Sequence, residues 1–380
     1  MPWTVLPKSV VDALEKPHRF AGKGRAMIRF ALVGCGRIAQ RYGTLFAANA
    51  IANARLVAAC ERLAPRRAAF AQKFGFPVHA DIDTMMRAHG EEIDVVAILT
   101  ESGTHAAVAA EVLRHGKHIV VEKPMALRLE DADAMIHGCD QAGVKLFVVK
   151  QNRFNLPVVK LREALDAGRF GRITMGTVRL RWCRTQAYYD QDAWRGTWAM
   201  DGGVFANQAS HHIDLLEWML GEPVSVFAKS RTALVDIEVE DTGAAIITFA
   251  GGAIGIVEAT NATRPVDLEG SLSILGEKGT VEIGGFAVNE MKVWNFATPA
   301  PGDGDVLERY RTNPPDVYGF GHGAYLKNVV DSLANGSPSL VDGLEGRKSL
   351  ELINAIYESI ETGREIALRF CPRQCKLGIG

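Results

Sequence analysis

The sequence has few of the features that mark membrane-bound, nucleic-acid-binding or metal-dependent proteins. No apolar run among its 380 residues approaches the length of a membrane span. The formal net charge is −1 at pH 7, which argues against a basic surface for nucleic acid. Cysteine and histidine lack the spacing of a metal site, so we expect no metal. These absences leave a globular protein that acts on a small molecule.

The first 26 residues lack the composition of a secretory signal peptide. Charged residues interrupt them throughout, and they contain no apolar core. We therefore expect residues 1–26 to form a poorly ordered extension and the protein to be cytoplasmic. In that compartment the six cysteines are expected to be reduced thiols: Cys35, Cys60, Cys139, Cys183, Cys371 and Cys375.

From residue 27 to residue 150, short apolar runs alternate with amphipathic stretches. The runs are rich in Val, Ile and Leu without polar alternation, as expected of a parallel sheet covered on both faces. This order predicts an α/β domain of the Rossmann type. The expected strands are Ile28–Val33, Arg55–Ala59, Phe76–His79, Val95–Leu99, His118–Val121 and Lys145–Val149, and the expected helices are Arg37–Ala50, Ala64–Phe74, Ile82–His89, Thr104–Arg114 and Leu129–Ala142.

After residue 150 the pattern becomes that of an α+β domain, expected over residues 151–370 and followed by a tail, 371–380. Period-two alternation predicts an open, largely antiparallel sheet with one covered face. The other face suits a partner subunit, so we expect a homodimer or homotetramer. The expected strands are Arg172–Trp182, Val224–Thr232, Gly243–Phe249, Ala253–Ala259, Glu269–Leu275, Thr280–Ile283 and Glu365–Phe370, and the expected helices are Pro157–Ala167, Tyr325–Leu333 and Gly343–Glu361.

The first predicted strand ends in a glycine turn, GCGRIA, that opens a helix. Gly34 permits the tight turn, Gly36 leaves room for phosphates, and Ala39 allows close packing of the helix on the strand. An anion bound there would meet the unpaired N–H groups at the start of the helix. The second strand ends in Glu61, a side chain that can accept hydrogen bonds from both ribose hydroxyls and would repel a 2′-phosphate. The pattern predicts a dinucleotide site that prefers NAD to NADP, although Arg62 weakens that preference.

Lys123 follows the fifth predicted strand, within Glu122-Lys123-Pro124. In an open α/β sheet, ligands bind outside the carboxyl ends of the strands, so Lys123 is expected beside the reactive end of the cofactor. A lysine partly removed from water has a lowered pKa and can exchange protons near neutral pH. The alternative is an ordinary surface lysine in a loop. Pro124 also allows a cis bond before it.

A second polar cluster lies in the other predicted domain, in NQASHHID. Asn207 and His211 are four residues apart and would share one face of a helix. Asp214 lies three residues after His211 and could orient its imidazole, a group suited to base catalysis near neutral pH. A structural histidine at a domain interface is the alternative, and it is the interpretation we prefer for His212. Lys123 and His211 can meet only between the two domains, where ligand sites tend to form. Together they suggest hydride transfer from an alcohol to a nicotinamide.

These motifs, in this order and spacing, resemble those of the Gfo/Idh/MocA family of NAD(P)-dependent oxidoreductases. GCGRIA, Glu122-Lys123-Pro124 and the GG…SHHIDLL segment carry the resemblance, which covers about Met27 to Phe370. It implies that Lys123 and His211 are the catalytic pair. Many members carry aspartate at the position of Asn207, and an amide cannot relay a proton, so Asn207 is expected to bind substrate or orient a group. The cofactor contacts implied are Gly34, Gly36, Arg37, Ile38, Glu61, Thr100, His105, Glu122, Lys123 and Gln151.

The segments KQNRFN, WRGTW, NQASHHIDLL and YGFGH resemble the branch of the family that acts on sugar nucleotides. The substrate implied is UDP-N-acetylglucosamine or its uronate, oxidised at the 3-hydroxyl, and Lys150 and Arg153 would suit its diphosphate or carboxylate. Two alternatives stay open: a dehydrogenase of free sugars or cyclitols such as inositol, and a non-catalytic dinucleotide sensor. The substrate contacts expected are Lys150, Arg153, Asn155, Trp194, Arg195, Asn207, His211, His322 and Tyr325.

Overall fold

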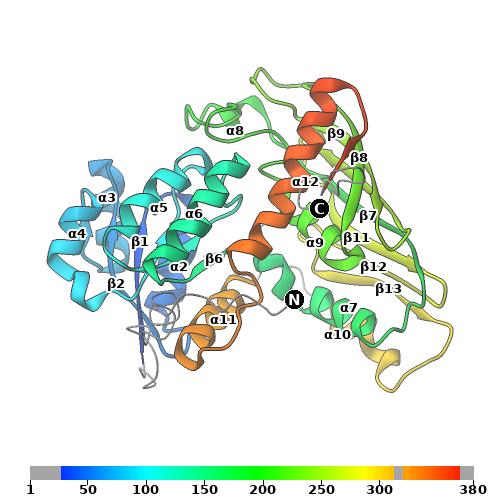
Figure 1. Ribbon diagram of the computed structural model, residues 1–380, viewed down its shortest axis with the longest axis horizontal. Coiled ribbons are helices and arrows are strands. Elements are labelled where there is room, and N and C mark those ends of the chain that lie inside the picture. The colour runs from blue at the N-terminus through cyan, green and yellow to red at the C-terminus, as the bar shows by residue number, and fades with distance from the viewer. Residues whose placement is uncertain (1–26, 312–318, 320, 369–380) are drawn as a thin grey trace, which may run out of the picture.

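The structure is a computed structural model that describes residues 27–311, 319 and 321–368. The extension 1–26, the tail 371–380 and part of the YGFGH segment lie outside these residues. Within them the chain forms two sheets, and helix α12 (Gly343–Thr362) runs between them (Figure 1). None of the helices in the described ranges is long and apolar enough to cross a membrane.

The first sheet has, within the described residues, six parallel strands in the order β3-β2-β1-β4-β5-β6. Every residue of the neighbouring strands β4 and β5 is buried, which explains why these segments are apolar without alternation. The order reverses between β1 and β4, so a ligand site is expected at the carboxyl ends of these strands. The strands are β1 (Ile28–Val33), β2 (Ala54–Cys60), β3 (Val78–His79), β4 (Val95–Ile98), β5 (His118–Val121) and β6 (Leu146–Val148).

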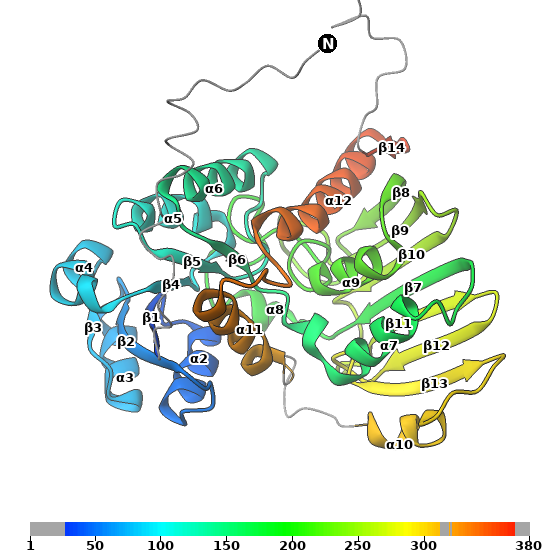
Figure 2. The same cartoon turned by 60° about the horizontal axis from the view of Figure 1, so that its bottom comes forward.

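Helices cover both faces of this sheet. One face packs against α4, α5 and α6, and the other against α2, α3 and α11, a helix that returns from late in the chain (Figure 2). Residues of α11, from beyond residue 150, therefore complete the core of the first domain. The helices are α2 (Arg37–Ala47), α3 (Ala64–Phe74), α4 (Ile82–His89), α5 (His105–Leu113), α6 (Leu129–Ala142) and α11 (Gly321–Asn335).

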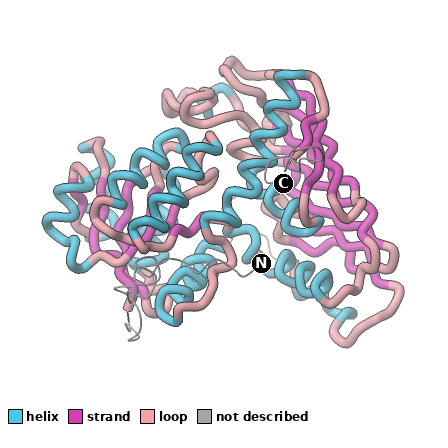
Figure 3. Tube along the Cα trace, in the orientation of Figure 1, coloured by secondary structure: helices cyan, strands magenta, loops and turns pink. Residues whose placement is uncertain are grey.

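The second sheet is mixed, with the order β13-β12-β11-β7-β10-β9-β8-β14 in the described residues. Its strands form one open layer, with helices on one side (Figure 3). Among the strand pairs that the structure describes in this sheet, only β7 and β10 are parallel, so the expectation of a largely antiparallel sheet is confirmed. The strands are β7 (Ile173–Arg181), β8 (Pro223–Arg231), β9 (Thr242–Phe249), β10 (Ile254–Thr260), β11 (Glu269–Gly276), β12 (Gly279–Gly284), β13 (Glu290–Phe296) and β14 (Ile366–Ala367).

One face of this sheet is covered and the other is open. Helices α7 (Leu156–Asp166), α9 (Ser210–Leu220) and α12 share a core with the covered face. The open face displays Phe227, Ile246 and Ile254, each more than a third exposed. Short helices occupy the connections: α8 (Gln186–Tyr189), α10 (Val306–Arg309), and the 3₁₀ turns η1 (Gly90–Glu92), η2 (Ser102–Thr104), η3 (Gln151–Phe154) and η4 (Asp303–Asp305).

The structure differs from the expected elements at the end of α2 and at β13. Helix α2 ends at Ala47 rather than at Ala50, because Asn49 adopts a left-handed conformation with φ of 51°. Strand β13 was not expected, since the polar residues in EMKVWNF obscure the alternation of its buried residues. The remaining predicted strands and helices are present, with described ends that differ by up to four residues. The last two residues of the expected strand Glu365–Phe370 lie outside the described residues.

Candidate active site

The glycine turn after β1 has the geometry that a dinucleotide phosphate requires. Gly34 has φ of +95°, and a Cβ there would lie 2.9 Å from the backbone oxygen of Leu99, so only glycine fits. A Cβ at Gly36 would meet nothing within 4 Å, which leaves open space in front of the turn. Helix α2 begins at Arg37 without a side-chain cap, so its first N–H groups remain available to an anion.

Glu61 lies against this turn at the end of β2. Its Oε2 accepts the backbone N–H of Cys35 at 2.9 Å, and its Oε1 accepts that of Leu63 at 2.9 Å. Each carboxylate oxygen keeps a lone pair that a ribose hydroxyl could use. Arg67 donates to the backbone oxygens of Glu61 and Arg62, and so braces the loop that carries the carboxylate. The turn and the carboxylate fit NAD.

Two loops at the ends of β4 and β5 are joined by His105. Its Nδ1 lies 2.9 Å from the backbone oxygen of Pro124, and its Nε2 lies 3.1 Å from that of Thr100. The ring is buried, so it positions the two loops rather than presenting itself to a cofactor. Thr100 lies next to the glycine turn, since its methyl group would be 3.2 Å from a Cβ at Gly34.

Glu122 and Lys123 follow β5, and the peptide bond between Lys123 and Pro124 is cis. Glu122 is buried and accepts the hydroxyl of Tyr42 at 3.3 Å. Burial opposes its ionisation, but His322, with Nε2 at 3.7 Å, and Lys123 hold the pKa of Glu122 below its ordinary value. Glu122 thus provides a buried negative charge that acts on Lys123.

The Lys123 side chain reaches across to the second domain. Its Nζ donates to the backbone oxygen of Asn207 at 2.9 Å and lies 3.4 Å from Asn207 Oδ1. Burial lowers the pKa of Lys123, the charges of Glu122 and Asp201 act in the opposite direction, and Lys150 lowers it further. The sequence suggested that Asn207 belongs to a helix together with His211. In the structure Asn207 instead lies in the turn that precedes α9.

His211 is the second residue of α9 and is 7% exposed. Neither of its ring nitrogens has a hydrogen-bond partner within the described part of the chain. Burial and the positive charges of Lys123 and Lys150 hold its pKa well below the ordinary value, so the imidazole is neutral. A neutral, unpartnered imidazole beside a lysine can accept a proton from a bound alcohol.

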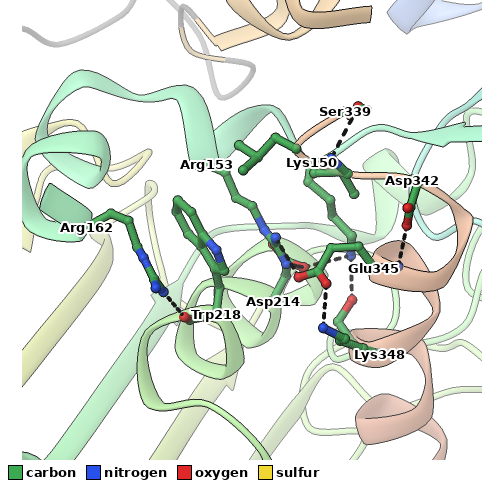
Figure 4. Close-up of polar contacts among 12 residues, drawn as sticks. Lys150, Arg153, Arg162, Asp214, Trp218, Ser339, Asp342, Glu345 and Lys348 are labelled. Carbon is green, nitrogen blue, oxygen red and sulfur yellow. Dashed lines mark hydrogen bonds and ion pairs between the residues drawn. The ribbon is translucent and has the colours of Figure 1, made fainter. Parts of the chain in front are cut away.

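Asp214 does not orient His211, contrary to the sequence-based expectation. Its carboxylate instead forms a two-point ion pair with Arg153, at 2.8 Å for each oxygen, and lies 3.4 Å from Lys150 Nζ (Figure 4). Glu345 of α12 pairs with the other side of Arg153 at 2.9 Å, and Ser349 accepts from Lys150 at 2.6 Å. This buried network joins η3, α9 and α12.

The structure therefore moves several expected substrate contacts into the interior. Lys150 and Arg153 are at most 3% exposed and their charges are already paired. Asn155 donates to the backbone oxygens of Ala287 and Val288, His322 lies beside Glu122, and Tyr325 is fully buried in the core. These side chains are buried around the site and contact other protein groups. The sequence indicated which residue types to expect near the site, but not that these side chains are buried.

Residues 186–200, which include the expected substrate contacts Trp194 and Arg195, lie against helices α2 and α3 of the first domain. Gln191 accepts from Arg37 of α2 at 2.6 Å, and Asp192 pairs with Arg66 of α3 at 2.6 Å. The backbone N–H of Gly103 also donates to the backbone oxygen of Met200 at 3.1 Å. We call residues 186–200 the strap, because these contacts fasten the segment to the first domain. Within the strap, Arg195 lies over the rings of Tyr188 and Trp194. Arg195 and Trp194 are only partly buried, so they remain candidates for substrate contact.

Fold and site together define an oxidoreductase with an NAD-binding Rossmann domain. Residues 28–150 match the model of the oxidoreductase family with an NAD-binding Rossmann fold, and residues 158–282 match that of the GFO/IDH/MocA C-terminal domain. The chain belongs to the Gfo/Idh/MocA family.

Solved structures and characterised relatives support that assignment. The WlbA dehydrogenase of Chromobacterium violaceum, crystallised with NADH and UDP-GlcNAcA, is 42% identical, with 92% of this chain and 98% of that chain covered and a TM-score of 0.84. The WlbA dehydrogenase of Bordetella pertussis, in complex with the same two ligands, gives the same identity and TM-score over 92% and 100%. The myo-inositol 2-dehydrogenase of Thermotoga maritima is 28% identical over 90% of this chain and 98% of its own. The protein is an NAD-dependent dehydrogenase of sugar or polyol hydroxyls.

Proposed function

We propose that the protein oxidises the 3-hydroxyl of a UDP-linked N-acetylated sugar, UDP-N-acetylglucosamine or its uronate, to the 3-keto sugar nucleotide. The observation that carries the proposal is the approach of Lys123 and His211 beside the NAD site, from two different domains. The 42% identity to two dehydrogenases crystallised with UDP-GlcNAcA supports the choice of substrate.

The two side chains have different tasks in this proposal. NAD, when bound, accepts the hydride from the carbinol carbon. The neutral imidazole of His211 takes the hydroxyl proton. Lys123 donates to Asn207 and directs its remaining N–H toward the substrate oxygen, where a positive charge stabilises the negative charge that develops as the proton leaves.

A dehydrogenase of free cyclitols is the second candidate, favoured by the identity to the myo-inositol 2-dehydrogenase. Absorbance of reduced nicotinamide separates the two candidates. Purified protein and NAD would be mixed with UDP-N-acetylglucosamine, its uronate or myo-inositol, each with and without 2-oxoglutarate as hydride acceptor. Reduction with only one of the two nucleotide sugars supports the proposal and shows whether carbon 6 of the sugar is an alcohol or a carboxylate. Reduction with inositol alone overturns it, and no reduction despite tight NAD binding indicates a sensor.

We further propose that the chain forms a cytoplasmic homodimer or homotetramer through the open face of its second sheet. Phe227, Ile246 and Ile256 lie opposite one another on neighbouring strands of that face. A second copy would cover this apolar row. The free thiols of Cys35, Cys60 and Cys139 suit a reducing compartment. Light scattering should give a dimer or tetramer, and Ile246→Glu should reduce the assembly; a monomeric wild type would contradict the proposal.

A further inference from the structure

We infer that Asp201, acting through Asn207, is a positioning residue that fixes the place and the charge of Lys123. The inference rests on the proposed role of Lys123 and adds to it a residue that neither the motifs nor the spacing indicated. Asp201 is 1% exposed and lies in the turn that leads to α9.

The connection between the two residues is a short chain of hydrogen bonds. Asp201 Oδ1 accepts from the side-chain amide Nδ2 of Asn207, and Asp201 Oδ2 accepts the backbone N–H of Gly196 at 2.8 Å. Because the Nδ2 of Asn207 is held by Asp201, the opposite end of the amide, Oδ1, must face Lys123. The orientation of the amide, and with it the second contact of Lys123 Nζ, depends on the carboxylate.

The carboxylate also contributes a charge. Within the described residues, four charged or titratable groups act on Lys123 or are acted on by it: Glu122 at the same strand end, Asp201 through Asn207, Lys150 just before η3, and His211 of α9. The two acids favour the ammonium form, while burial and Lys150 oppose it. Removal of the Asp201 charge therefore lowers the pKa of Lys123.

Asp201 is itself placed to be sensitive to its surroundings. Burial raises its pKa to about 6, whereas Gly196, Asn207, Arg195 and Lys123 act to lower it. The hydrogen-bonding contacts of its carboxylate are neutral amides, which hold the charge without neutralising it. In the part of the chain that the structure describes, Asp201 is a buried carboxylate without an ion-pair partner, and Asn207 alone links it to the proposed catalytic lysine. This arrangement suits an electrostatic role better than a purely structural one.

The test uses four variants of the full chain: Asp201→Asn, Asn207→Asp, the double variant with both changes, and Glu240→Gln. Glu240 is the matched control, since it is another buried carboxylate that holds the same segment, through the backbone N–H of Phe205, but is not among the groups that act on Lys123. Each variant would be assayed for kcat and KM across pH, and for its melting temperature.

Asp201→Asn should lower kcat by about 10- to 100-fold, because the lysine is misplaced, with little change in KM for NAD. The basic limb of kcat/KM should move to lower pH by about one unit, since the ammonium form is lost earlier. The double variant reverses the amide and the carboxylate, so it should recover activity relative to either single variant and move the limb back to higher pH. Glu240→Gln should alter the melting temperature without shifting the limb.

A direct titration keeps this inference separate from the proposed function. The Nζ of Lys123 would be followed by ¹⁵N NMR in lysine-labelled protein, assigned with Lys123→Arg, and needs no substrate. A lowered Lys123 pKa in Asp201→Asn supports the inference even when no substrate is turned over. If Asp201→Asn does not fold, Asn207→Ala tests the same connection from its other end. An unchanged Lys123 pKa, together with an unshifted limb, would overturn the inference.

Discussion

Lys123 Nζ lies 2.9 Å from the backbone oxygen of Asn207, a residue 84 positions further along the chain and in the other domain. The contact joins the carboxyl end of β5 to the turn before α9. His211, the proposed proton acceptor, follows four residues later, on α9 itself. The proposed active site is therefore complete only when the two domains are docked as they are in this structure.

Replacement of Lys123 by alanine should lower turnover by about 10²- to 10⁴-fold, the usual contribution of a positioned acid or base. The dissociation constant for NAD should change little, because the glycine turn and Glu61 hold the other half of the cofactor site. Steady-state kinetics and NAD titration measure the two effects. Lys327→Ala, which removes an exposed lysine from α11, is the control. Turnover like that of the wild type would remove Lys123 from the mechanism.

The two adjacent histidines provide a matched pair of variants. His211→Asn should reduce kcat by about 10²-fold or more, because the proton acceptor is lost. His212→Asn should leave kcat near the wild-type value, since His212 is buried against the ring of Trp182 and burial lowers its pKa to about 4. Melting temperatures would show whether either variant acts through folding. Equal kinetic losses in both variants would mean that His211 is structural.

Glu61→Ala should weaken NAD binding by about 10- to 100-fold, as expected for the loss of charged hydrogen bonds to a ribose. Binding of NADP should weaken less or improve, because the carboxylate no longer repels a 2′-phosphate. Fluorescence titration with both cofactors gives the ratio of the dissociation constants. Glu92→Ala, at an exposed carboxylate paired with Arg55, serves as the control. An unchanged ratio would show that another group holds the ribose.

The strap predicts an effect on the release of the cofactor. Asp192 of the strap pairs with Arg66 of α3, in a partly exposed ion pair. Such pairs contribute up to about 1 kcal/mol, so Asp192→Asn should speed NADH dissociation by about 2- to 5-fold. Stopped-flow displacement of NADH by excess NAD measures this rate, and Asp190→Asn is the control within the same strap. The difference should disappear at high salt. An unchanged rate at low salt would show that the pair does not restrain the cofactor.

The sequence was most informative where local rules decide the structure. Gly34 and Glu61 could be placed because a parallel sheet brings the ends of β1 and β2 to one edge. Lys123 could be placed for the same reason, as the residue two positions after β5. In each case the feature depends on the strand end and the turn next to it, and both are visible in a short stretch of sequence.

The rest of the site depends on contacts between distant segments. Arg153 and Asp214 are 61 positions apart, and no local pattern shows that they pair in the interior. Asp201 lies in an irregular turn without periodicity, so its hydrogen bond to Asn207 gives no signal in the sequence. Tyr325 is buried because α11 returns to pack on the first sheet. The pattern of apolar residues within α11 predicts a buried helix face but does not show which sheet that face contacts.

Glu240 predicts a pH dependence of stability. Its carboxylate is 5% exposed, and Oε1 accepts from the N–H of Phe205 at 3.1 Å and from the hydroxyl of Tyr357 at 3.0 Å. Oε2 has no partner within the residues that the structure describes. Burial raises the pKa of Glu240 to about 7, above the ordinary value of 4.5. The folded state therefore favours the protonated form.

The sign of the effect follows from this raised pKa. Its contribution to stability is fully present below pH 4.5, decreases as the pH rises, and is lost above pH 7. Glu240→Gln keeps the shape of the side chain and removes its titration. The free energy of unfolding of the variant should therefore rise relative to the wild type between pH 5 and pH 8, by on the order of 3 kcal/mol. Urea unfolding of both proteins across this range measures the difference, with Glu92→Gln as an exposed control. Parallel curves for wild type and Glu240→Gln would mean that Glu240 titrates near its ordinary pKa and that the buried segment before α9 tolerates its charge.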